Sequence, residues 1–204
     1  MGRMGSAFRP VSVPPFDQIK NGGIRFLRKK NTTLFLTSNA VIAALYAALT
    51  IALAPISYGP VQFRVSEALT VLPFLMPGSV LGITLGCLLA NLYTGNIMDM
   101  IFGTLATYLA GVMTAHFGKK GNTVKNRMLG CGMPVAFNAV IVGAVLTWAY
   151  QLREFSDPLA SFAFNGLTVG LGEAGVLYLI GYPLLVSLPK MKFFREFTDK
   201  INNT

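Results

Sequence analysis

Long apolar runs alternate with short polar or basic stretches along this chain. Six apolar stretches can be delimited, at about residues 34–54, 61–76, 78–93, 97–117, 132–152 and 166–188. A helix needs roughly 20 residues to cross about 30 Å of hydrocarbon, with a usual range of about 17–25. The first, fourth, fifth and sixth stretches meet that length. The pattern therefore predicts an all-α, polytopic membrane protein with a six-transmembrane-helix bundle.

The second and third stretches are short, and only Pro77 and Gly78 separate them. Pro-Gly is a strong turn signal, and Pro73 already weakens a continuous helix. We therefore expect a tight helical hairpin here. The alternative is one long broken helix, which would give five spans.

The basic residues distinguish the two sides of the predicted bundle. With six spans, both termini and the 118–131 loop lie on one side, and 15 of the 17 Lys and Arg residues fall there. Cytoplasmic loops carry such an excess of Lys and Arg, so the pattern predicts an N-in, C-in topology. We expect residues 1–32 to form a cytoplasmic tail, 33–190 the membrane domain and 191–204 a second cytoplasmic tail. Part of residues 1–15 could be an artificial extension of the natural chain.

Composition narrows the class of protein. Only 12% of residues are charged and the mean hydropathy is +0.56, which excludes an ordinary soluble enzyme or binding module. The chain has no G-x-x-x-x-G-K-[ST] motif, so we expect it not to hydrolyse ATP itself. One His and no paired nucleophile leave little for an intramembrane enzyme, and we expect no metal or cofactor. Cys87 and Cys131 match no metal or redox spacing and are interpreted as core residues.

Several polar residues within the apolar stretches are predicted to share one depth. Ionisable residues inside a membrane are costly and often functional. The predicted topology places Glu173 seven residues inside the outer end of its helix, roughly 10 Å deep. Other polar residues fall near the outer ends of three further stretches. This convergence predicts a binding cavity open to the outside, with Arg64, Glu67, Asn91, Asp99 and Glu173 as candidates, and Asn138 in mid-helix as either a ligand contact or an interhelical bond.

Structural interpretations of the same residues remain open. Arg64 and Glu67, three residues apart, could simply pair, and Asp99 could simply cap a helix. The first apolar stretch also carries two neighbouring stripes of small residues, which suit either packing inside the bundle or docking of another membrane subunit. The candidate docking residues are Ala40, Ala43, Ala47, Ala44 and Ala48.

Three segments resemble the QueT family. They are residues 54–74 (APISYGPVQFRVSEALTVLPF), 86–92 (GCLLANL) and 99–107 (DMIFGTLAT), within a resemblance covering about residues 38–190. Its most specific part is the Q-F-R-x-S-E-A-L run. QueT proteins are substrate-binding (S) components of energy-coupling factor (ECF) transporters, which are ABC importers. The resemblance implies partners, namely a T component and two ABC ATPases, and docking through small-residue faces.

The resemblance also implies a substrate, a queuosine precursor such as 7-aminomethyl-7-deazaguanine. Three acids against one arginine suit a ligand with an alkylammonium group, and a carboxylate can accept two hydrogen bonds from a guanine-like edge. Tyr58 or Phe63 could stack on the flat ring. An S component for another vitamin or nucleobase, a structural subunit and a membrane enzyme are the alternatives.

Overall fold

A computed structural model of the chain describes residues 32–57 and 63–202. All elements in these two ranges are helical. They are α1 (Thr32–Ala52), α2 (Ala54–Ser57), η2 (Val65–Val71), α3 (Leu72–Leu75), η3 (Pro77–Ser79), α4 (Val80–Thr94), η4 (Asp99–Gly103), α5 (Thr104–Lys119), α6 (Val124–Ala144), η5 (Val145–Ala149), α7 (Pro158–Val176), η6 (Leu177–Gly181), α8 (Tyr182–Ser187), η7 (Leu188–Lys190) and α9 (Lys192–Asn202). The predicted all-α class is therefore confirmed for the described residues.

Five continuous helical stretches in the described residues are long and apolar enough to cross a membrane. They are Thr32–Ala52, Pro77–Thr94, Asp99–Lys119, Val124–Ala149 and Pro158–Lys190. The predicted second span is instead an 11-residue apolar helix, Val65–Leu75, made of η2 and α3. At about 2 Å per residue in its 3₁₀ part and 1.5 Å in its α part, it extends roughly 20 Å, less than the hydrocarbon thickness.

Helices α1 and α4 run in the same direction at very close range. A Cβ atom at Gly82 would lie 2.9 Å from the Asn39 carbonyl oxygen, and one at Gly86 would lie 2.8 Å from that of Ala43. The short helix that comes between them in the chain runs the opposite way. Its Ser66 hydroxyl lies 2.5 Å from that of Thr50, whereas the later residue Leu72 packs on Ile42, nearer the start of α1. The chain therefore returns along α1 through residues 65–75 before α4 begins.

Helices α6 and α7 begin at Val124 and Pro158, before the apolar stretches predicted to start at residues 132 and 166. The Thr123 side chain accepts a hydrogen bond from the Asn126 amide at the start of α6, and Asp157 caps α7 just before Pro158. Capping residues and a proline in the first turn favour helix starts at these positions. The helices thus extend beyond the apolar segments predicted for them.

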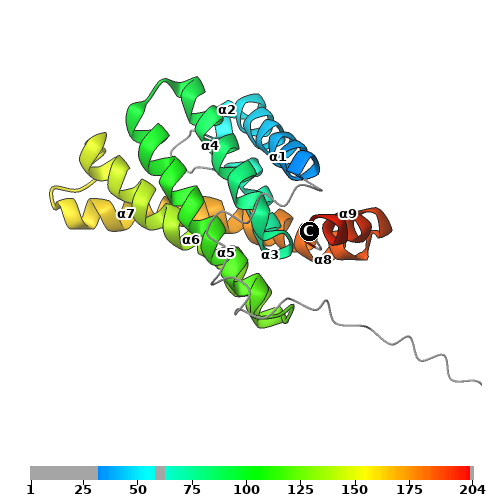
Figure 1. The fold of residues 1–204 in the computed structure, drawn as a ribbon. Coiled ribbons are helices and arrows are strands. Elements are labelled where there is room, and N and C mark those ends of the chain that lie inside the picture. The colour runs from blue at the N-terminus through cyan, green and yellow to red at the C-terminus, as the bar shows by residue number, and fades with distance from the viewer. Residues whose placement is uncertain (1–31, 58–62, 203–204) are drawn as a thin grey trace, which may run out of the picture.

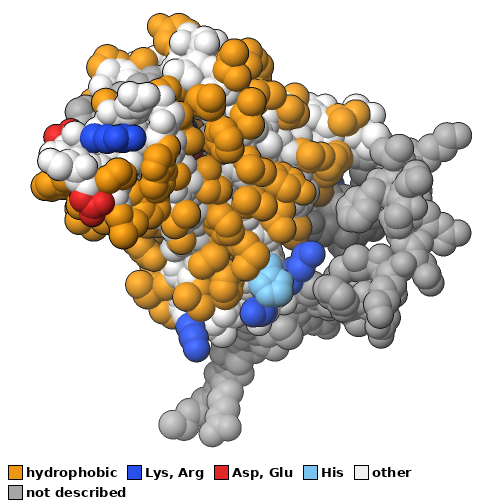
Figure 2. Space-filling view, turned by 90° about the vertical axis from the view of Figure 1, so that its left-hand side faces the viewer, with side chains coloured by type: hydrophobic (Ala, Val, Ile, Leu, Met, Phe, Trp, Pro, Cys, Tyr) orange, Lys and Arg blue, Asp and Glu red, His pale blue; other side chains and the backbone are white. Residues whose placement is uncertain are grey.

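Helices α4, α5 and α6 lie beside one another, and α7 packs on α6 (Figure 1). Figure 2 shows one face of the bundle, on which apolar side chains cover most of the surface and charged side chains lie at the two ends. Leu81, Leu85 and Leu89, one turn apart on α4, are each about half exposed. An apolar belt of this kind suits contact with lipid.

The cytoplasmic tail predicted for residues 191–204 contains a helix that was not predicted. Residues Lys192–Asn202 form α9, and Phe194 packs against the cluster of Ile42, Leu72 and Ile83. The expected N-terminal tail, by contrast, lies almost entirely outside the described residues.

Candidate functional site

Glu67 is the centre of a buried polar cluster inside the bundle. Its side chain is fully buried, its Oε1 lies 3.8 Å from Arg64 Nη1, and Tyr46 donates a hydrogen bond to the same oxygen. The 3₁₀ conformation of η2 has three residues per turn, which places residues three apart on one side. Within the described residues, Glu67 Oε2 has no hydrogen-bond partner.

Hydroxyl groups fix the register of this cluster on α1. Thr50 Oγ1 lies 2.5 Å from Ser66 Oγ and donates to the Tyr46 carbonyl at 2.9 Å. All three residues are fully buried. These contacts hold the first turn of η2 against α1 and align Glu67 with the Tyr46 hydroxyl.

Glu173 is a second buried carboxylate, on α7. Its side chain is 2% exposed, and Asn138 on α6 donates to its Oε1 at 2.9 Å. The two helices approach closely nearby, since a Cβ at Gly143 would lie 2.8 Å from the Gly166 Cα. Glu173 Oε2, like Glu67 Oε2, has no hydrogen-bond partner among the described residues. Asn138 therefore orients this carboxylate but leaves one oxygen available.

Arg64 connects the two carboxylates electrostatically. Its guanidinium interacts with both Glu67 and Glu173, and the two acids also interact with each other. Phe63, which precedes Arg64 in the chain, contacts the same helix as Glu173, because a Cβ at Gly175 would be 3.1 Å from its Cε2 atom. Two carboxylates and one guanidinium thus share a buried region, which carries one surplus negative charge when all three are ionised.

Asp99 and Asn91 contact each other near Cys87 of α4. Asn91 donates to the Asp99 backbone carbonyl at 2.8 Å and points toward Cys87 Sγ at 3.4 Å. The half-buried Asp99 side chain faces Tyr150, and burial together with this carboxylate raises the pKa of the Tyr150 hydroxyl above its ordinary value. The Glu67 side chain, by contrast, contacts Tyr46 and Arg64. The candidate acids are therefore divided between two places.

Comparison with known proteins supports the resemblance noted in the sequence. The profile of the QueT transporter family matches residues 36–190. The chain belongs to the QueT transporter family. A curated relative, the Queuosine precursor transporter QueT of Lactococcus lactis subsp. cremoris (strain MG1363), is 41% identical over 81 residues, which is 39% of this chain and 48% of the relative. The match thus spans about half of that relative's length. No solved structure matches the chain. Family membership and five membrane-length helices make this a multi-pass membrane protein.

The five alanines of α1 that were predicted to dock another subunit fall into a buried and an exposed group. Ala43 and Ala47 are 5% and 9% exposed and lie on the side of α1 that packs on α4. Their burial favours the first interpretation, packing inside the bundle, for these two residues. Ala40, Ala44 and Ala48 are exposed. Docking stays a prediction for these three.

Three further polar residues of this QueT family chain were not predicted for the cluster: Tyr46, Thr50 and Ser66. The sequence could have indicated the two residues of α1, because Tyr46 and Thr50 fall with Asn39 on one face of the first apolar stretch. Tyr58, predicted as a stacking residue, lies outside the described residues.

Proposed function

We propose that this chain is the substrate-capturing S component of an ECF-type importer, and that it binds the queuosine precursor 7-aminomethyl-7-deazaguanine from outside. The observation that carries the proposal is the pair of buried carboxylates, Glu67 and Glu173. Each has one oxygen that accepts a hydrogen bond and one oxygen without a hydrogen-bond partner in the part of the chain that the structure describes. The name of the Lactococcus lactis relative supports the same class of substrate.

Buried acceptors without partners are costly, so a ligand that supplies donors is stabilised where they converge. A guanine-like edge offers two adjacent N–H donors, which match one carboxylate, and an aminomethyl group offers a cation to another. We assign Glu67 to the edge, because it belongs to the most specific motif. We assign Glu173 rather than Asp99 to the cation, because Glu173 shares the buried region with Glu67.

Neighbouring side chains suit the rest of such a ligand. Asn138 and Arg64 can donate to its carbonyl and ring acceptors, and Phe63 can stack on its flat ring. Asn91 retains a buried Oδ1 without a hydrogen-bond partner in the described residues. It donates to Cys87, which packs on Tyr46. We therefore place Asn91 at the edge of the proposed site.

The proposed topology has six passes with both termini in the cytoplasm. It is supported by the parallel course of α1 and α4, which requires residues 65–75 to bring the chain back across most of the membrane. It is also supported by the 15 basic residues that then fall on the cytoplasmic side. In this orientation, Glu67 lies toward the outer end of the bundle.

The energy for uptake would come from partners, a T component and two ABC ATPases. We propose that Ala40, Ala44 and Ala48 on the exposed side of α1 dock the T component, since small residues allow close helix approach in lipid.

Isothermal titration tests the substrate assignment with two ligands, 7-aminomethyl-7-deazaguanine and its neutral 7-cyano analogue. Glu173→Gln should weaken binding of the aminomethyl compound about ten- to a hundredfold and spare the cyano compound, because a charged hydrogen bond contributes roughly 1.5–3 kcal/mol. Glu67→Gln should weaken both ligands, because an amide offers one acceptor to two donors. Glu196→Gln, on the exposed polar side of α9, is the matched control.

Other outcomes reject the proposal in distinct ways. If both buried variants bind both ligands like the unmodified chain, these carboxylates do not form the site. Binding of a different vitamin or nucleobase would indicate an S component with another substrate. Absence of binding to any of these compounds would favour a structural subunit, and turnover of a ligand would favour an enzyme.

A further inference from the structure

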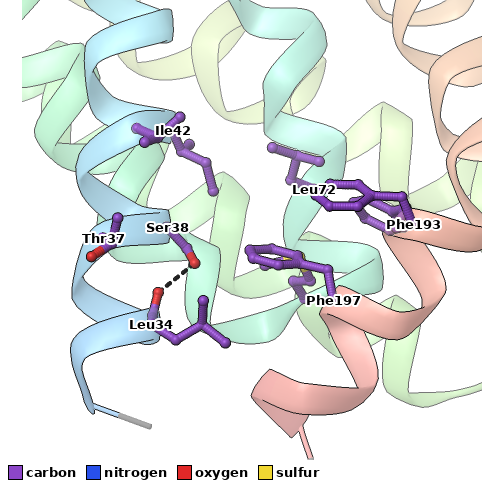
Figure 3. Close-up of a pocket in the computed structure, with 10 residues that line it drawn as sticks. Leu34, Thr37, Ser38, Ile42, Leu72, Phe193 and Phe197 are labelled. Carbon is purple, nitrogen blue, oxygen red and sulfur yellow. Dashed lines mark hydrogen bonds between the residues drawn. The ribbon is translucent and has the colours of Figure 1, made fainter.

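An apolar groove of about 310 Å³ lies between α1 and α9, at the opposite end of α1 from Thr50. Its apolar lining includes Leu34, Val41, Ile42, Leu72, Phe194 and Phe197. In Figure 3, Phe193 and Phe197 extend from α9 toward the side of α1 that carries Ser38 and Ile42. The volume falls within the range of about 300–1,000 Å³ found for small-ligand sites.

The groove offers a ligand very little hydrogen bonding. The Ser38 hydroxyl donates to the Leu34 carbonyl at 2.5 Å, within its own helix (Figure 3). Apart from Ser38, Thr37 is the one hydroxyl-bearing residue among the described residues that line the groove. An occupant must therefore be mainly hydrocarbon.

Helix α9 has the pattern of a helix that lies in a membrane interface. Phe193, Phe194, Phe197 and Ile201 fall on one side, and the charged residues fall on the other. Phe193 remains 75% exposed, and its ring stacks on that of Phe197 at 6.2 Å. A short amphipathic helix with charged residues opposite aromatic ones is typical of interfacial segments.

The surroundings of the groove identify the class of occupant. Val41, on its rim, is 52% exposed on the apolar outer surface of α1, where lipid is the surrounding medium. Residues 190–200 carry four basic and two acidic side chains, and Lys192 directly precedes the groove residues Phe193 and Phe194. The ion pair of Lys192 with Glu196 is long, at 3.9 Å, and exposed, so Lys192 can turn to another anion.

We propose that the groove between α1 and α9 binds one acyl chain of an anionic phospholipid, with the headgroup beside Lys192. The acyl chain fills the space between the two helices, and the negative headgroup meets the excess of positive charge at the start of α9. A bound lipid of this kind would fix α9 against the bundle.

Photolabelling tests the proposal with the full chain in phosphatidylcholine nanodiscs. The probe is phosphatidylglycerol with a diazirine on its acyl chain, and labelled residues are mapped by mass spectrometry. Labels should concentrate on residues 34–41 and 193–197. Val41→Trp fills the groove and should reduce that labelling several-fold, whereas Leu45→Trp, one turn further along α1 and 51% exposed, should leave it unchanged.

A separate variant tests the contact between Lys192 and the lipid headgroup. Lys192→Gln should lower the preference for phosphatidylglycerol over a phosphatidylcholine probe by about fivefold, the effect expected for one surface cation. Even labelling along all lipid-facing helices, or equal labelling in Val41→Trp and Leu45→Trp, would overturn the proposal. Labelling of the groove that disappears only when a second protein or a second copy binds would assign the groove to that partner instead. Thermal unfolding of both Trp variants establishes that each is folded.

Discussion

Removing the hydroxyl of Tyr46 should destabilise the fold through Glu67. In the Tyr46→Phe variant the ring still fills its fully buried site, so little packing is lost. Glu67 Oε1 keeps Arg64 at 3.8 Å but loses its hydrogen-bond donor, and Oε2 already has no such partner in the described residues. Hydrogen bonds to charged groups contribute roughly 1.5–3 kcal/mol, so we expect the free energy of unfolding to fall by about that amount.

A double-mutant cycle isolates this interaction. In a Glu67→Gln background the acceptor is neutral, and neutral side-chain hydrogen bonds between membrane helices average about 0.6 kcal/mol. Tyr46→Phe should therefore cost at least about 1 kcal/mol less in that background than in the unmodified chain. The assay is reversible unfolding in mixed micelles at increasing fractions of denaturing detergent.

Tyr178→Phe is the matched control. The Tyr178 hydroxyl donates to the Met128 backbone carbonyl at 3.1 Å, and the residue is 37% exposed. This neutral bond should contribute about 0.6 kcal/mol. Equal losses from the two Tyr→Phe variants, or equal losses from Tyr46→Phe in both backgrounds, would refute the role assigned to the Tyr46–Glu67 contact.

Three other predictions address topology, docking and packing. In single-cysteine variants, a membrane-impermeant thiol reagent added outside should modify residue 155 and not residue 122; the reverse pattern would contradict the proposed N-in, C-in topology. Ala44→Leu should reduce co-purification with the T component while ligand binding by the isolated chain is unchanged, and normal uptake by this variant would remove the docking role. Gly86→Ala should lower the free energy of unfolding by about 1–3 kcal/mol, because its Cβ would overlap α1. Gly170→Ala should not lower it, because the nearest atom to its Cβ would be 3.4 Å away, and detergent unfolding of both variants measures the difference.

Hydropathy predicted the long helices because burial in lipid depends mainly on the length of an apolar run. It did not predict where α6 and α7 begin, because Thr123 and Asp157, which cap them, are polar residues outside those runs. Helix α9 was missed for a related reason. Its average composition is polar, and only the spacing of Phe193, Phe194 and Phe197 marks its apolar side.

The candidate site was predictable where it depends on local spacing. Arg64 and Glu67 lie three residues apart, and the structure pairs them. The contact between Tyr46 and Glu67 joins residues 21 positions apart, so it depends on the register of η2 against α1. The predicted depth of Asp99 did not indicate that its side chain faces Tyr150, because depth along a helix does not specify rotation about it.

The short helix of residues 65–75 has a consequence for biogenesis. A segment enters the bilayer from the translocon according to its own hydrophobicity, so a short segment with ionisable residues inserts poorly. With 11 helical residues, and with Arg64 and Glu67 at one end, this segment is poorly suited to insert alone. Its burial depends on Tyr46 and Thr50 of the helix before it and on Glu173's helix, which is synthesised about a hundred residues later. Insertion of the chain should therefore be completed only after its last long helix has emerged, so that the buried charges enter the membrane as part of an assembled bundle.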